Sequence, residues 1–317
     1  MDNPLSRRTP DGPVVPDMWQ LGMGEERARV AIVGCGGAGC NILRYVIAPP
    51  NAVRIAMNDT VVPSMADIPS RVIVPAASLQ AYALMDEKAV RSMETEEEKQ
   101  ISAAFPDRDV VLILGGLGDE FGGWGMSLVG RVARILGDAT LAFATIPFGL
   151  EGPIRRQLAE AQLHLLQKRV DGVVPFGNDQ LLQVAKDRPM SKALAALSAI
   201  MARPVSSLSS VLARSDVFPF RRMLSRVHDW RYGMGAGREK HRCFVAVEEA
   251  YASPWFTSLP EEVSHAIVLM SVQEPGSDEP EILHEVRRRS PKALLAWSTL
   301  PRAEGDDRVI VQLLAGT

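Results

Sequence analysis

A glycine-rich segment that could bind phosphate occupies residues 34–41, where the sequence reads GCGGAGCN. A short β-branched run, 29–34, precedes it, and a helical pattern begins at residue 41. Glycine lets the backbone approach an anion with no Cβ in the way, and the N–H groups at the start of a helix attract negative charge. The residue types and their spacing therefore predict a phosphate-binding loop between a strand and a helix.

The same loop leaves a second chemistry open. Gly34, Gly36 and Gly39 match the G-x-G-x-x-G pattern of dinucleotide sites. Asp59 lies at the end of the next apolar run, where an acid would bind a ribose. A nicotinamide-dependent oxidoreductase is thus an alternative at this point. We interpret the two cysteines of the loop as small residues in a tight turn, because a metal site would need more ligands nearby.

The elements that must position this loop alternate along the chain. Strands that are almost entirely apolar are buried on both faces, so the predicted fold class is α/β, with a Rossmann-like parallel sheet covered by helices on both sides. A second glycine-rich turn is expected at 115–125, directly after the fourth strand. The expected strands are 29–34, 53–59, 71–74, 109–114, 139–148 and 172–176, and the expected helices begin at 41 and cover 86–104, 126–136 and 154–170.

The pattern changes after residue 190. An Ala/Leu/Ser-rich helix is expected there, interrupted by Pro204, and a smaller α/β unit follows it. The later elements are a glycine turn at 233–237, strands at 265–272, 292–299 and 308–315, and helices over 238–252 and 279–290. The predicted domains are a flexible N-terminal arm (1–27), a nucleotide-binding GTPase-like domain (28–189), a central helix (190–213) and a C-terminal α/β domain (214–317).

Composition excludes several functions. The chain of 317 residues has 35 basic and 38 acidic side chains, so it lacks the basic excess that would predict nucleic-acid binding. No apolar stretch reaches about 18 residues, and we expect no transmembrane segment. Three cysteines are too few for a disulfide framework, and their odd number favours the reducing cytoplasm. Five scattered histidines lack the spacing of metal ligands, and no metal-binding residues are predicted.

Motifs further along the chain bear on the two alternatives. The fifth strand ends in TIPFGLEGPIRR, the sixth is followed by NDQLL, and a second glycine loop follows the fourth. In this order and at this spacing, the segments resemble the FtsZ branch of the FtsZ/tubulin superfamily, from about residue 29 to the end of the chain. The resemblance implies that fold and a bound guanine nucleotide, GTP or GDP. It argues against the oxidoreductase, for which the sequence also offers no plausible hydride-transfer site.

The resemblance implies roles for individual residues. The first glycine loop would line the phosphates, and Glu151 and Arg155 would meet the ribose and base side. Asn178 would read guanine, since an amide matches the donor and acceptor edge of a purine. An ion pair between Glu151 and Arg155, four residues apart at a helix start, is the alternative. The predicted nucleotide-binding residues are Gly36, Gly37, Gly39, Asn41, Asn58, Gly116, Gly118, Gly122, Glu151, Arg155 and Asn178.

Two phosphate loops depart from the family pattern. The second glycine loop reads GDEFGGW at 118–124, where the family alternates glycine with threonine. A carboxylate about 4 Å from a phosphate is repelled by about 4 kcal/mol at an effective dielectric constant of about 20. A Mg²⁺ ion between Asp119 and phosphate would invert this sign, so Mg²⁺ stays open. The loop after the third strand, VPAASLQAY (74–82), contains no glycine.

The predicted catalytic loop departs as well. In the family, hydrolysis needs subunits stacked head to tail, and a loop with two acids reaches the nucleotide of the next subunit. The corresponding segment here is ARSDVFPFRR (213–222), in which Asp216 is the one acid. One acid cannot do the work of two that polarise and orient water, and Asp216 also fits a helix N-cap.

The sequence thus predicts a divergent FtsZ-like, guanine-nucleotide-binding protein with weak or absent GTP hydrolysis. It would be a cytoskeletal or membrane-remodelling component. The alternatives are an active GTPase that forms cell-division-type filaments and an interaction module without nucleotide. The expected partners are further copies of the chain, head to tail, and an unidentified protein at a membrane.

Overall fold

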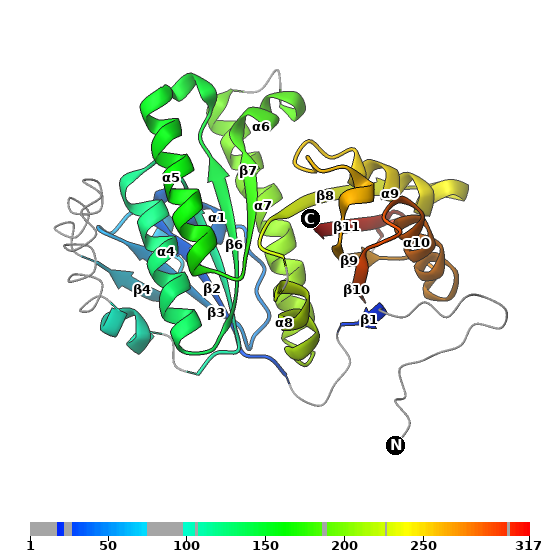
Figure 1. Cartoon of the computed structure of the whole chain (residues 1–317), viewed down its shortest axis with the longest axis horizontal. Coiled ribbons are helices and arrows are strands. Elements are labelled where there is room, and N and C mark those ends of the chain that lie inside the picture. Colours follow the sequence, from blue (N-terminus) through cyan, green and yellow to red (C-terminus); the bar gives the residue numbers. More distant parts are fainter. Residues whose placement is uncertain are drawn as a thin grey trace.

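Two sheets with a long helix between them make up the protein (Figure 1). The computed structural model describes residues 18–21, 27–74, 98–104, 107–185, 189–225, 227–302 and 305–317. The glycine-free loop at 74–82 lies outside these residues after Val74, as does most of the helix expected at 86–104, of which 98–104 are helical. The long helix, α7 (Met190–Leu212), separates the six-stranded sheet from the five-stranded one.

The six-stranded sheet is parallel throughout, in the order β4-β3-β2-β5-β6-β7. Its central strands are buried at every position because alternate residues face two different cores. Val30 and Ile32 pack with α1 and α7, whereas Ala31 and Val33 pack with α4 and α5. The predicted parallel, doubly covered sheet is confirmed. Its elements are β2 (Val30–Cys35), α1 (Gly36–Leu43), β3 (Val53–Asn58), β4 (Ser70–Ile73), β5 (Val110–Gly116), α4 (Glu120–Ile135), β6 (Ala139–Ile146), α5 (Pro153–Arg169), β7 (Gly172–Gly177) and α6 (Asn178–Val184).

The second sheet has the order β1-β10-β9-β11-β8 and mixes parallel with antiparallel pairs. Helices α9 and α10 pack on one face, and α7 packs on the other through the core it shares with the first sheet. The elements are β1 (Met18–Gln20), α8 (Phe218–Leu224), β8 (Trp230–Gly237), α9 (Arg242–Tyr251), β9 (His265–Ser271), α10 (Pro275–Arg289), β10 (Leu294–Thr299) and β11 (Val309–Gly316).

The glycine turn expected at 233–237 is wrong, because these residues are the end of strand β8. Their glycines alternate, so they share one face of the strand, and α9 lies directly on that face. A Cβ on Gly233 would sit 1.9 Å from the Ala250 carbonyl oxygen, and one on Gly235 would sit 2.1 Å from that of Ala246. The glycines therefore serve close packing of a helix on a strand, and not chain reversal.

The N-terminal arm is not loose over its described part. Residues 18–20 form β1, which pairs in parallel with β10 at the edge of the second sheet. The N–H of Leu21 donates to the Trp297 carbonyl oxygen at 2.6 Å, and the Leu21 side chain is buried in the core shared with α7. Pairing with an open strand edge ordered a segment whose composition gave no strand pattern.

Two further expectations need correction. The second glycine segment is mostly helical, since β5 runs to Gly116 and α4 begins at Glu120. Helix α7 continues through Pro204, because Met201, Val205 and Leu208 on either side are fully buried and hold the helix together. Within the described residues, α7 alone is long and apolar enough to cross a membrane. Its apolar residues are those that bridge the two sheets.

Candidate functional site

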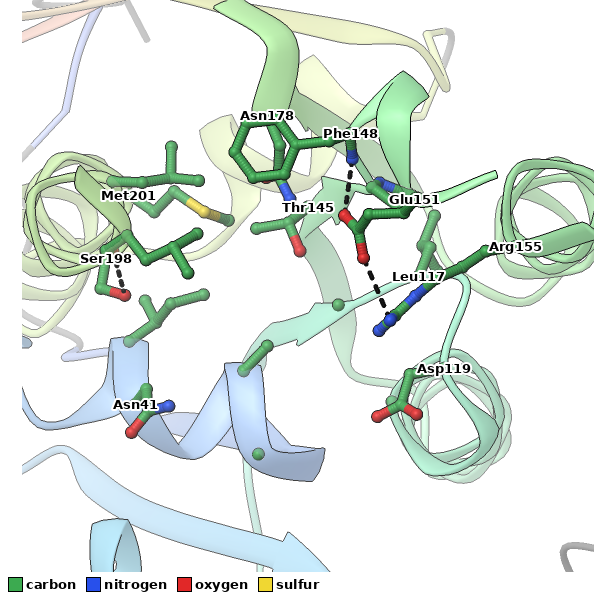
Figure 2. Close-up of a pocket in the computed structure, with 18 of the residues that line it drawn as sticks. Asn41, Leu117, Asp119, Thr145, Phe148, Glu151, Arg155, Asn178, Ser198 and Met201 are labelled. Carbon is green, nitrogen blue, oxygen red and sulfur yellow. Dashed lines mark hydrogen bonds and ion pairs between the residues drawn. The ribbon is translucent and has the colours of Figure 1, made fainter. Parts of the chain in front are cut away.

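A cavity of about 470 Å³ opens at the carboxyl ends of β2, β5 and β6 (Figure 2). Strand β2 lies between β3 and β5, so the chain builds the sheet outward from β2 to β4 on one side and from β5 to β7 on the other. Such switch points leave a crevice in open parallel sheets and are where ligands bind. The volume is within the range of small-molecule sites, about 300–1,000 Å³.

The first glycine loop forms the floor of the cavity, and α1 begins inside it, at Gly36 rather than at residue 41. Gly36 has φ +70°, a backbone conformation that favours glycine. A Cβ on Gly39 would lie 2.3 Å from the Leu114 carbonyl oxygen, so α1 touches β5 there. Gly37 has open space where a side chain would be. The helix start therefore presents bare backbone to the cavity, as anion sites require.

The predicted residues divide into two groups. Those that line the cavity are Gly37, Asn41, Gly116, Gly122, Glu151, Arg155 and Asn178. Those that do not are Gly36, Gly39, Asn58 and Gly118. Asn58 is buried, and its Nδ2 donates to the Thr60 carbonyl oxygen at 3.0 Å.

Glu151 and Arg155 form the ion pair that the sequence left as an alternative. The Arg155 Nη1 lies 3.0 Å from Glu151 Oε2, and the backbone N–H of Phe148 donates to Glu151 Oε1 at 2.7 Å (Figure 2). Both carboxylate oxygens therefore have partners at the start of α5. The Arg155 side chain is about half exposed, so this pair can open toward a ligand at a modest cost.

Asn178 is the first residue of α6 and lines the cavity beside Phe148 (Figure 2). Its Oδ1 is buried and has no hydrogen-bond partner. A buried amide oxygen without a partner costs about 1–3 kcal/mol, and native proteins rarely keep one without a reason. A rotation of the side chain would bring this oxygen into the cavity, where it could accept a hydrogen bond from a ligand.

The second glycine loop brings a carboxylate to the cavity. Asp119 is exposed, lines the cavity and precedes α4, as Figure 2 shows below Arg155. Phe121 and Trp124 are buried in the core beneath the sheet, with ring centroids 5.4 Å apart. A Cβ on Gly122 would lie 2.2 Å from the Gly116 carbonyl oxygen. The remaining glycines of this loop thus allow close backbone packing.

The charge of the cavity is not that of a strong phosphate site. Among the described lining residues the ionised side chains are Arg155, Glu151 and Asp119, one cation against two carboxylates. Cys35 also lines the cavity, but complete burial raises the pKa of its thiol well above the usual value, so it stays neutral. Attraction for phosphate must therefore come from the backbone N–H groups of the α1 start. The described residues hold no cluster of His, Cys, Asp or Glu suited to a metal ion.

Asp216 lies away from this cavity, in the connector between α7 and α8. Its Oδ1 accepts a hydrogen bond from the backbone N–H of Phe218 at 2.9 Å, at the first turn of α8. Asp216 precedes the N-cap residue of α8, Val217, so this contact is a local turn and not the N-cap hydrogen bond that the sequence left as an alternative. A catalytic role for Asp216 would need a second copy of the chain to bring the connector to a nucleotide.

A charged network fastens α8 to the amino-terminal edge of the first sheet. Arg221 donates to the carbonyl oxygens of Gly137 and Asp109, at 2.6 and 3.1 Å. Arg29 donates to both carboxylate oxygens of Asp109 at 3.0 Å. This pair lowers the pKa of Asp109, whereas burial raises the pKa of neighbouring Asp138 to about 6. The Arg221 guanidinium therefore holds α8 against the first sheet.

Sequence reasoning missed one wall of the cavity. Five residues of α7 line it, Met190, Leu194, Leu197, Ser198 and Met201. Their spacing follows one helical face, but the same spacing fits a core helix, and only the fold shows that this face borders a cavity. Ser198 is the polar member, and its Oγ donates to the Leu194 carbonyl oxygen at 3.0 Å (Figure 2).

Known proteins are similar to this chain in sequence and in fold. Residues 29–186 match the Tubulin/FtsZ family, GTPase domain. The chain is 27% identical to Cell division protein FtsZ 1 of Pyrococcus furiosus over 304 residues, which are 92% of this chain and 82% of that protein. Its fold is similar to the empty FtsZ dimer of M. jannaschii, with a TM-score of 0.79 and 22% identity over 92% of this chain and 89% of that one. It is also similar to the GTPγS-bound protofilament of CetZ2 from Haloferax volcanii, with a TM-score of 0.69 and 14% identity over 91% and 92% of the two chains.

Proposed function

Since the chain is a divergent FtsZ-like member of the FtsZ/tubulin superfamily, we propose that it holds a guanine nucleotide in the cavity at α1 and hydrolyses GTP slowly or not at all. The observation that carries this proposal is the buried, unpartnered Oδ1 of Asn178. A guanine base would supply the missing donor. Gly37 and Asn41 would lie along the phosphates, and Glu151 and Arg155 would turn toward the ribose.

Weak hydrolysis is supported by the charges on both sides of a shared site. Asp119 lines the cavity where the terminal phosphate would lie, and repels it. The connector that a second copy would insert carries Asp216, whose carboxylate already accepts from the Phe218 N–H, and Arg221, which donates to backbone carbonyls. General base catalysis contributes about 10²–10⁴-fold, and here its second acid is absent. With an Asp119 carboxylate beside the phosphates, a Mg²⁺ ion could bind, and its test is the effect of chelation on affinity.

We further propose that copies associate head to tail, as a cytoskeletal or membrane-remodelling component with an additional protein partner. The support is the similarity to a dimer and to a protofilament of related fold. Contact between copies rests on shape and apolar burial, which do not require catalytic acids. Three buried, unpaired cysteines suit a reducing cytoplasm. The proposed units remain the arm (1–27), the nucleotide-binding domain (28–189), the central helix (190–213) and the C-terminal domain (214–317).

Nucleotide binding is tested by identifying what co-purifies with the protein and by titrating GDP and GTP calorimetrically. We expect guanine nucleotide, with GDP bound about as tightly as GTP. A preference for GTP of tenfold or more, about 1.4 kcal/mol, would contradict the damaged terminal-phosphate site. Failure to bind any guanine nucleotide would favour the interaction module without nucleotide. The Asp119 carboxylate is compatible with that alternative, because it disfavours phosphate in the cavity.

Hydrolysis is tested by phosphate release measured against protein concentration. We expect a flat line near zero, even where copies associate in sedimentation. Turnover that rises with concentration would show that stacked copies complete the site, and would restore the active filament-forming GTPase.

A further inference from the structure

A buried glutamine forms hydrogen bonds to the backbone of the second glycine loop, on the side of the loop away from the cavity. Gln162 lies on α5 and is 2% exposed. Its Oε1 accepts a hydrogen bond from the backbone N–H of Gly118 at 2.7 Å, and its Nε2 donates to the Asp119 carbonyl oxygen at 2.8 Å. One side-chain amide thus bonds to the backbone of two consecutive loop residues, which lie 44 and 43 residues before it in the sequence.

The loop is shaped to receive this side chain. A Cβ on Gly123 would lie 2.3 Å from Gln162 Cδ, so the amide fits only against a glycine. Gly118 has φ +80°, a conformation that favours glycine and lets its N–H turn toward α5. Helices α4 and α5 lie side by side on that face of the sheet (Figure 1), which brings the amide within reach of the loop.

The consequence is visible in the cavity lining. Leu117 and Asp119 border the cavity, but Gly118 between them does not, because its N–H points to Gln162. A glycine loop binds phosphate through such N–H groups. Here the Gly118 N–H donates to a side-chain amide oxygen on the far side of the loop, and the loop offers the Asp119 carboxylate to the cavity instead.

We propose that Gln162 is a positioning residue that sets the number of phosphates the site accepts. It consumes the Gly118 amide and so makes the cavity a nucleoside-diphosphate site, in which a third phosphate gains no hydrogen bond from the second glycine loop. This inference rests on the proposed function, because it assumes that a guanine nucleotide occupies the cavity.

The test compares GDP and GTP affinities in Gln162→Met, which keeps the volume of the side chain and removes both hydrogen bonds. The freed Gly118 amide can then turn toward a terminal phosphate, and we expect the ratio of GTP to GDP affinity to rise about tenfold. Gln167→Met is the matched control. It lies on the same helix, and its Nε2 donates to Asp229 Oδ1 at 2.6 Å, away from the loop. The control should leave the ratio unchanged.

A second variant separates the proposed role from a merely structural one. Gln162→Glu keeps an oxygen that accepts from Gly118 and, where ionised, adds a charge that repels a terminal phosphate, so the ratio should not rise above the wild-type value. Both variants can lower the melting temperature, so that quantity does not decide. An unchanged ratio in a folded Gln162→Met protein, or the same rise in Gln162→Glu, would overturn the inference. If Gln162→Met does not fold, a risen ratio in Gln162→Glu overturns the inference and a ratio that does not rise supports it. Wild-type protein that binds neither nucleotide refutes the proposed function itself.

Discussion

Replacing Asn178 by alanine should weaken nucleotide binding without lowering the stability of the ligand-free protein. The Oδ1 atom is buried without a partner, so the ligand-free protein already carries the cost of removing it from water. A bound base that donates to this oxygen recovers about 1–3 kcal/mol, equivalent to about 5- to 150-fold in Kd. Asn178→Ala should therefore weaken GDP binding by about 5- to 150-fold. It should leave the stability of the ligand-free protein unchanged or raise it by about 1 kcal/mol, because the orphaned atom is gone.

The assay is calorimetric titration with GDP, paired with urea unfolding of the ligand-free protein. Asn51→Ala is the control, because the Asn51 side chain also uses its amide, donating to the Ala213 carbonyl oxygen at 3.1 Å, but outside the cavity. The control should keep the affinity. Wild-type GDP affinity in Asn178→Ala, together with a loss of stability, would show that the amide serves the fold and that the reasoning from its unpartnered oxygen is wrong.

Four further substitutions test the site and the network at the opposite edge. Glu151→Ala should weaken nucleotide binding by about 1–3 kcal/mol in titration. Cys35→Ala, which removes a neutral buried thiol, should change the affinity little. Unchanged affinity in Glu151→Ala would mean that Glu151 serves only as the ion-pair partner of Arg155. Asp119→Asn should strengthen GTP binding about tenfold more than GDP binding, since the charge it removes repels the terminal phosphate, and equal effects on both would place that phosphate elsewhere. Asp138, whose pKa burial raises to about 6, contributes stability that is full below about pH 4 and lost as pH rises through 6. Asp138→Asn should therefore exceed the wild type in free energy of unfolding by about 3 kcal/mol at pH 8 and by less at pH 5, and a difference independent of pH would contradict this.

How far the sequence predicts this molecule depends on whether a signal is local. The first sheet could be predicted because runs such as DVVLIL at 109–114 are apolar at every position, which a strand covered on both faces requires. Strand β1 could not, since its order comes from pairing with β10, 277 residues away at the Met18–Leu295 pair. The glycines of β8 read as a turn because only the position of α9 shows that they make room for a helix.

The candidate site follows the same rule. The loop at 34–41 and the Glu151–Arg155 spacing are local, and they predict cavity residues. Gln162 carries no local signal at all, because a glutamine in the middle of an amphipathic helix is ordinary. Its meaning appears only when α5 lies beside α4 and the amide meets the Gly118 backbone.

The pairing of β1 with β10 has a consequence for handling the protein. Without residues 18–20, the N–H and C=O groups along one side of β10 would form an open sheet edge, and such edges recruit strands from other molecules. Leu21 would leave its buried place at the same time. A shortened chain that begins at β2 would therefore be prone to aggregation through the second sheet, although it keeps every residue that lines the cavity. Tags and cleavage sites are safer placed before residue 18 than after it.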